Sequence, residues 1–247
     1  MRRLHNWYMA ESKKGTYHVG ANYTNDDFCH GDGTIWLGFE QLFHLYQLDS
    51  LDICIMQIWI LRCMMRAQSN KLDIGFLDPQ IMNKTMVLSR PDDVVDYISC
   101  AFERHTDKDK ILVPYLMKAH WILLVLETSR DHIVVMDSRR KDQSEFQEVL
   151  DVFNRAFGHY KKSTMKSEFS VRVGFQCLKQ PPGNNCCGFY AMRYMMYFTD
   201  DYFHINDEEG MDTSSLLDHT IWGLQDEFAG FIVREIIDPK GVHHLSR

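Results

Sequence analysis

Apolar residues along the chain recur mostly at helical spacing, interrupted by a central block of shorter β-rich runs. Residues 52–65 are apolar nearly all round, which predicts a buried helix. Pro91, followed by two aspartates, has the composition of a helix first turn. Phe146, Val149 and Phe153 lie on one stripe of another helix. The predicted helices are 39–46, 52–65, one that begins at 91, 143–160, 187–198 and 214–236.

The central block predicts strands. Residues 111–117, 120–127 and 132–137 are short β-rich runs separated by two to four polar residues, and residues 128–131 resemble a hairpin turn. Residues 169–177 alternate apolar and polar positions and predict a further strand, whereas 73–79 contains Gly and Asp-Pro signals of a loop. Runs of helices around such strands predict an α+β fold with a mostly antiparallel sheet packed against helices.

The first residues differ from the rest of the chain. Residues 1–34 are polar, contain glycine and show no period, which predicts a loosely ordered lead-in. The remainder, 35–247, contains no linker and predicts one domain of a size that can bury a substantial core.

The composition of the chain argues against several classes of function. The net charge of −7 argues against nucleic-acid binding, which needs a basic face. Seven irregularly spaced cysteines make a poor disulfide framework and suit a reducing compartment. The longest apolar run, 53–61, is shorter than the roughly 20 residues of a membrane span, and no secretory signal is visible. We expect a soluble, intracellular, monomeric protein with no membrane partner.

The candidate chemistry begins at residues 180–188, Gln-Pro-Pro-Gly-Asn-Asn-Cys-Cys-Gly, which form a rigid loop ahead of an apolar helix. A thiol at a helix N-terminus or beside an imidazolium has a pKa below its free value of about 8.5, and its thiolate is a good nucleophile. Cys187 and Cys186 compete for this role, because adjacent helical side chains point about 100° apart. The position next to Gly188 favours Cys187, since glycine leaves room for a substrate backbone.

Two further groups complete an acyl-transfer site. If the hairpin turn centres on 128–130, antiparallel pairing places His120 within a couple of residues of Asp137. The carboxylate can then hold one imidazole nitrogen while the other faces a thiol. The side-chain amide of Gln180 and the backbone N–H of Cys187 can bind an oxyanion, an interaction typically worth about 3–4 kcal/mol.

A zinc site is an alternative use of the same cysteines. Cys177, Cys186 and Cys187 with a histidine would supply ligands, but the chain has no Cys-x-x-Cys pair and adjacent cysteines give poor tetrahedral geometry. We expect no metal and no organic cofactor.

At these residues the chain resembles the ubiquitin-like-protein-specific cysteine proteases, the Ulp/SENP family that processes SUMO and its relatives. The matching features are His120-Trp121, Asp137 before Ser138, and the loop from Gln180 to Gly188, in the family's order. The Gln-Pro-Pro-Gly-x-x-x-Cys-Gly spacing is similar to the plant branch, including its transposon-associated copies.

The resemblance implies a papain-like fold and a role for each matching residue. Cys187 would be the nucleophile, His120 the base, Asp137 its orienting carboxylate and Gln180 the oxyanion donor. It also implies a SUMO-type modifier and its conjugates as partners, with cleavage after a Gly-Gly tail, and a nuclear location.

The resemblance also bears on substrate binding. Trp121 would form one wall of the tunnel that admits the tail, and Asp52 would begin the substrate-facing helix. The tryptophan expected a few residues before that aspartate is absent, and Asp49-Ser50 stand there instead.

Two other functions fit the same residues. A degenerate, transposon-derived homologue would bind a ubiquitin-like protein without cleaving it, although all four catalytic positions are intact. An acetyltransferase of related architecture would share the residue order, but nothing in the sequence suggests a cradle for the phosphates of an acyl-CoA.

Overall fold

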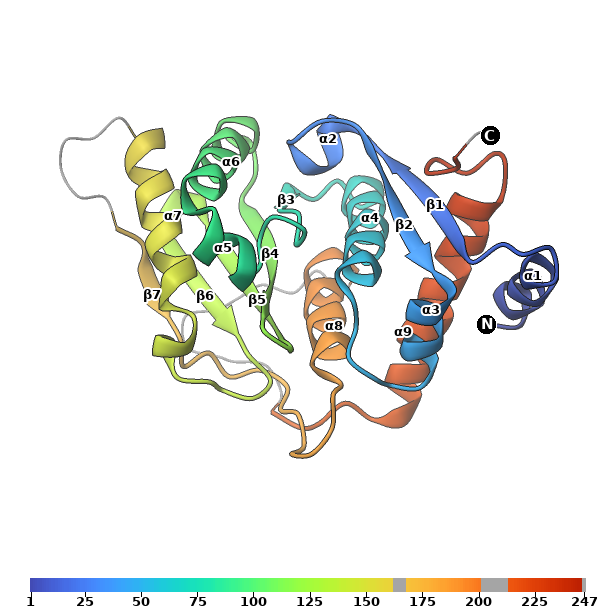
Figure 1. The fold of residues 1–247 in the computed structure, drawn as a ribbon. Helices are drawn as coiled ribbons and strands as arrows, with labels where there is room; N and C mark the ends of the chain where they lie inside the picture. The colour runs from blue at the N-terminus through green and yellow to red at the C-terminus, as the bar shows by residue number, and fades with distance from the viewer. Residues whose placement is uncertain (162–167, 201–212, 246–247) are drawn as a thin grey trace.

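The computed structural model describes residues 1–161, 168–200 and 213–245. Its centre is a five-stranded sheet with helices on both faces (Figure 1). The strands lie in the order β3-β4-β5-β6-β7. Their bounds are β3 Ile74–Phe76, β4 Lys110–Met117, β5 His120–Glu127, β6 His132–Met136 and β7 Ser170–Arg172.

The three central strands are antiparallel, as predicted. Leu116 pairs with Trp121 across β4 and β5, and Leu123 pairs with Met136 across β5 and β6. The two edge strands, β3 and β7, each pair in parallel over three residues. The prediction of a loop over 73–79 is therefore wrong at β3, and the predicted strand 169–177 is shortened to β7. Three-residue edge strands are too short to show a period in the sequence.

The central strand β5 is buried along its whole length because helices cover both faces of the sheet. Its side chains alternate between two apolar clusters, as the two-residue period of a strand requires. Leu123 and Val125 contribute to the cluster around α4 Ile53–Ser69 and α8 Cys187–Thr199. Leu124 and Leu126 contribute to the cluster around α6 Pro91–Arg104 and α7 Gln147–Tyr160.

The predicted helices are present. The longest described helix, α4, has 17 residues, and none of the described helices is long and apolar enough to cross a bilayer. The indole N–H of Trp59 on α4 donates to the backbone oxygen of Met192 on α8 at 3.1 Å, which joins the two helices inside the core. The bounds are α3 Phe39–Tyr46, α4 Ile53–Ser69, α5 Lys84–Ser89, α6 Pro91–Arg104, α7 Gln147–Tyr160, α8 Cys187–Thr199 and α9 Asp218–Phe231, which continues as a π-helical segment, η3 Ile232–Ile237.

The prediction of a loosely ordered lead-in over 1–34 is wrong. The segment forms α1 Arg2–Ser12, an antiparallel pair of β1 His18–Tyr23 with β2 Gly33–Gly38, and α2 Asn25–Phe28 between these strands. Strand β2 runs across the predicted boundary at residue 35.

The side chains of this segment reach the core, where Leu4, Ala21 and Phe28 are buried. The sequence does not reveal this order because each element is short and its apolar partners come from distant parts of the chain. Asn22, for example, donates its backbone N–H to the backbone oxygen of His243 at 2.9 Å.

Candidate active site

Cys187 is the first residue of α8, as predicted, and only 1% of it is exposed. The loop before it cannot be helical: Pro181 and Pro182 restrict the backbone, and Gly183 has a φ of 85° in the left-handed region. Because Cys187 begins the helix, its backbone N–H lies outside the intrahelical hydrogen-bond ladder. The helix dipole favours negative charge at this end.

The two adjacent sulfurs lie apart, as expected from the helical geometry. The Cys187 Sγ is 3.8 Å from the backbone oxygen of Ala119, whereas the Cys186 Sγ is 3.8 Å from the backbone oxygen of Leu48. Cys187 therefore lies against the turn between β4 and β5, directly before His120, and Cys186 does not.

His120 and Asp137 are brought together by the hairpin of β5 and β6. His120 is the first residue of β5, and Asp137 directly follows the last residue of β6. The distance from His120 Nε2 to Asp137 Oδ1 is 2.6 Å, and both side chains are buried. Backbone N–H groups of Arg139 and Lys141 also donate to the carboxylate, at 2.8 and 2.7 Å. These bonds hold the carboxylate in one orientation.

The second imidazole nitrogen of His120, Nδ1, is the one left to interact with the thiol. It is buried and has no partner with full hydrogen-bond geometry among the residues described. The thiol of Cys187 is nevertheless close enough for each group to shift the pKa of the other.

The pKa values move in the directions of an ion pair. Burial by itself lowers the pKa of His120, but the hydrogen bond with Asp137 and the interaction with Cys187 outweigh burial and raise the pKa to about 9. Burial by itself raises the pKa of the Cys187 thiol, but His120 and the backbone N–H of Trp121 outweigh it and the pKa falls. The charge of Arg139 adds to this fall. The arrangement favours thiolate and imidazolium over the neutral pair.

Gln180 is buried beside this group, with 4% of it exposed. Its Oε1 accepts a hydrogen bond from the Ser138 hydroxyl at 3.0 Å, and its backbone N–H donates to the Ser138 oxygen at 2.9 Å. Its Nε2 donates to the backbone oxygen of Asn184 at 2.9 Å and to Asn184 Oδ1 at 2.5 Å. The amide is thus held next to the catalytic candidates, with its N–H groups directed at Asn184.

The predicted substrate-binding residues border the same region. Trp121 is buried, and its indole N–H donates to the backbone oxygen of Leu51 at 2.9 Å. Asp52 is the exposed N-cap of α4 and accepts from the backbone N–H of Cys54. A Cβ on Gly188 would lie 2.8 Å from the Leu51 side chain, so glycine is needed there for packing. A substrate-binding role for these residues stays a prediction.

Two contacting residues were not identified from the sequence. The exposed Arg139 donates from Nη2 to the backbone oxygen of Asn184 at 2.6 Å. Asn184 in turn binds Gln180, so this pair connects the loop after β6 to the loop before α8. Polar residues in such loops are common, and only the contacts distinguish these two.

The structure offers no metal site in the ranges that it describes, where no group of three or more His, Cys, Asp or Glu could hold a metal ion. The Sγ of Cys177, a ligand in the zinc hypothesis, lies 3.6 Å from the backbone oxygen of Asp137.

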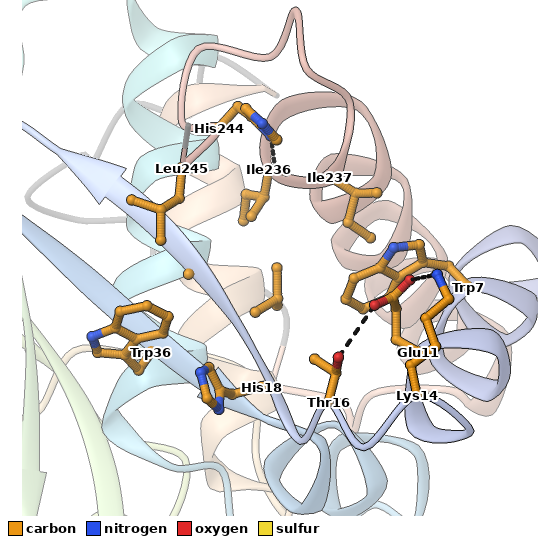
Figure 2. A pocket seen from close by; sticks show the side chains of 12 residues that line it. Trp7, Glu11, Lys14, Thr16, His18, Trp36, Ile236, Ile237, His244 and Leu245 are labelled. Atoms are coloured by element: carbon orange, nitrogen blue, oxygen red, sulfur yellow. Dashed lines mark hydrogen bonds and ion pairs between the residues drawn. The ribbon is translucent and has the colours of Figure 1, made fainter. Parts of the chain in front are cut away.

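A cavity of about 710 Å³ lies elsewhere in the molecule (Figure 2). It opens to solvent and is bordered by α1, β1, β2 and the C-terminal segment, with Trp7, His18, Trp36 and Ile237 among its lining residues. None of Cys187, His120, Asp137 and Gln180 lines it, so the chemistry inferred above is not located there.

Several solved structures with a similar fold are SUMO proteases. The SUMO protease Ulp1 with its catalytic cysteine oxidised to a sulfonic acid has 15% identity and a TM-score of 0.58, and the match covers 86% of this chain and 88% of that one. The C-terminal Ulp1 protease domain in complex with Smt3, the yeast ortholog of SUMO, has 15% identity and a TM-score of 0.56, with 87% of each chain covered.

A third solved structure, the Chaetomium thermophilum Ulp1-like SUMO protease catalytic domain, has 14% identity and a TM-score of 0.51, with 72% and 70% covered. At these identities the likeness shows the fold, which is the papain-like α+β fold expected from the sequence. No curated protein matches the chain.

The model of one family does match the sequence, and it covers most of the chain. Residues 55–229 match the C-terminal catalytic domain of the Ulp1 protease family. This range includes His120, Asp137, Gln180 and Cys187. The chain therefore belongs to the Ulp1 protease family.

Proposed function

We propose that this protein is an active cysteine peptidase that cleaves after the Gly-Gly tail of a SUMO-type modifier through an acyl-thioester on Cys187. The observation that carries the proposal is geometric: the buried His120 imidazole lies 2.6 Å from Asp137, and the Cys187 sulfur at the start of α8 lies against Ala119, directly before His120. The lowered pKa of the thiol and the imidazole pKa of about 9 agree with this arrangement.

In the proposed reaction the Cys187 thiolate attacks the carbonyl carbon of the terminal glycine. The carbonyl oxygen takes the negative charge and is bound by the Gln180 amide and the backbone N–H of Cys187. His120 then gives its proton from Nδ1 to the leaving amine, and the C–N bond breaks. Water then attacks the thioester carbonyl while His120 takes one of its protons, and the C–S bond breaks. The acid leaves as a carboxylate with its proton released to solvent, and the thiolate–imidazolium pair is restored. Asp137 holds Nε2 throughout.

The choice of modifier is supported by the relatives. The similar structures are described as SUMO proteases, and one of them holds Smt3. By the family resemblance, Trp121 would form one wall of a diglycine tunnel, and Asp49 and Ser50 take the place of the tryptophan expected for the other wall. We propose that the substrate is a SUMO-type modifier and that its Gly-Gly tail binds in a tunnel that lacks the wall usually formed by the second tryptophan.

Labelling with SUMO, NEDD8 and ubiquitin vinyl sulfones tests this function. We expect covalent labelling by the SUMO probe that is lost in Cys187→Ala and kept in Cys186→Ala. The Cys186 variant is a matched control because its sulfur lies against Leu48 rather than beside Ala119. SUMO binding without labelling would instead show a non-cleaving homologue, and acetyl transfer from acetyl-CoA without labelling would show an acetyltransferase.

A further inference from the structure

Both acceptors that lie within hydrogen-bond distance of the Gln180 Nε2 are atoms of Asn184. A side-chain amide carries two N–H donors. Asn184 accepts from Nε2 with two atoms, its backbone oxygen at 2.9 Å and its Oδ1 at 2.5 Å. For Gln180 to bind an oxyanion, as the proposed function requires, one of these two bonds must be exchanged.

The bond to the backbone oxygen of Asn184 is anchored. Arg139 Nη2 donates to the same oxygen at 2.6 Å. Pro181 and Pro182 restrict the backbone of the loop that contains Asn184. Moving this oxygen would require the backbone of the loop to move and the contact with Arg139 to break.

The bond to Asn184 Oδ1 can be exchanged by rotation of a side chain. Asn184 is only partly buried, so its side chain has solvent on one side. Its Oδ1 also accepts from the backbone N–H of Cys186 at 3.1 Å. The oxygen thus sits between the Gln180 amide and the start of α8, which are the two places from which the oxyanion donors come.

We propose that Asn184 Oδ1 is an internal placeholder: in the resting protein it occupies the Gln180 N–H that later binds the oxyanion. The inference rests on the proposed function and adds a positioning residue to it. Asn184 keeps the buried amide satisfied before substrate arrives, which avoids the cost of an unpaired buried donor.

The exchange favours the transition state. A charged oxyanion binds an N–H roughly twice as strongly as a neutral oxygen does, so it displaces Asn184 Oδ1. The neutral carbonyl of the bound substrate competes with Oδ1 on equal terms and gains little. The free energy of breaking the bond between Gln180 and Asn184 Oδ1 is therefore offset only in the transition state, when the oxyanion forms. The presence of Asn184 thus changes kcat rather than KM.

The test is Asn184→Ala, assayed on a SUMO substrate with a cleavable C-terminal fusion. The backbone oxygen of residue 184 and the Ser138 contacts still orient Gln180 in this variant. We expect kcat to rise by about threefold to tenfold, the worth of one net hydrogen bond, with KM unchanged. Asn185→Ala is the matched control, because the Asn185 Nδ2 donates to Asp49 Oδ1 and its side chain makes no hydrogen bond with Gln180 among the residues that the structure describes.

Two further measurements separate the outcomes. Alkylation of Cys187 by iodoacetamide forms no oxyanion, so its rate should be the same in Asn184→Ala as in the wild type if the loop stays folded. In a Gln180→Ala background the gain from Asn184→Ala should vanish, because the shared donor is gone.

A loss of kcat in Asn184→Ala with normal alkylation would overturn the placeholder, since it would mean that Oδ1 holds Gln180 in its working position. A gain that persists in Gln180→Ala would also overturn it. If the proposed function itself fails, the wild-type protein shows no cleavage and Gln180→Ala changes nothing, which is a different result from either.

Discussion

Two regions of this molecule contain cysteine, histidine and aspartate in close contact, and only one has the properties of a reactive site. The second region, here called the N-terminal cluster, consists of Cys29, His30, Asp78 and His105. In it, His30 Nε2 lies 2.6 Å from Asp78 Oδ2, the same distance as in the His120–Asp137 pair. Cys29 Sγ lies 3.8 Å from His105 Nε2.

The pKa values of the two regions move in opposite directions. In the N-terminal cluster, burial raises the pKa of the Cys29 thiol to about 11 and lowers the pKa of His105. Both groups are therefore neutral near pH 7. In the candidate site the pKa of Cys187 falls and that of His120 rises to about 9, which favours the charged forms.

The difference lies in how the imidazoles are shared. In the N-terminal cluster the two contacts are made by different histidines: His30 binds the Asp78 carboxylate, and His105 contacts the Cys29 thiol. In the candidate site one imidazole contacts both, so the carboxylate stabilises the positive charge that the thiolate needs. A His–Asp hydrogen bond of 2.6 Å is by itself no sign of a catalytic residue.

The largest contrast should come from replacing the two aspartates. Asp137→Asn removes the charge that holds His120, and we expect kcat/KM to fall by about 10²–10⁴. Asp78→Asn should leave kcat/KM of the folded protein within about twofold, but lower the free energy of unfolding by about 1–3 kcal/mol. Asp78 is fully buried and accepts from Gln57 and from the backbone N–H of Gln80.

Cleavage assays and urea titration measure both effects. Equal losses of activity in the two variants, after correction for the folded fraction, would show that the N-terminal cluster participates in the chemistry.

The second largest contrast should be in pH dependence, because the thiols of Cys187 and Cys29 should ionise in different pH ranges. On the acid side, kcat/KM should rise as Cys187 ionises below the usual pKa of a thiol, and on the alkaline side it should fall near pH 9 as His120 loses its proton. Iodoacetamide alkylation, followed by peptide mass spectrometry, should modify Cys187 near neutral pH and Cys29 only as the pH approaches 11. Alkylation of both thiols over the same pH range would show that the two regions do not differ in this way.

The smallest effect should follow Cys29→Ala. Cys29 is buried but its thiol is neutral, so we expect a loss of about 1 kcal/mol in the free energy of unfolding and no change in kcat/KM. Thermal unfolding and the cleavage assay are the measurements. Reduced kcat/KM in the folded variant would connect this cysteine to the candidate site.

Local pattern was sufficient for the elements that carry the site. The helix at Cys187 was predictable because prolines and a glycine stop any helix before it and an apolar stripe follows. The hairpin that pairs His120 with Asp137 was predictable because strand period and turn length constrain the register. The ordered structure of residues 1–34 was not predictable, because Leu4 and Phe28 are buried against parts of the chain that lie far away in sequence.

What the amino-acid sequence determined by itself is which reactive groups exist and which local element presents each one. The tertiary structure alone decided that His120 is shared by Asp137 and Cys187, that Cys29 and His30 are not joined in this way, and that Asn184 holds the Gln180 amide. The reason is the short range of these interactions: hydrogen bonds and desolvation change within a few ångströms, whereas period and composition carry no information at that scale.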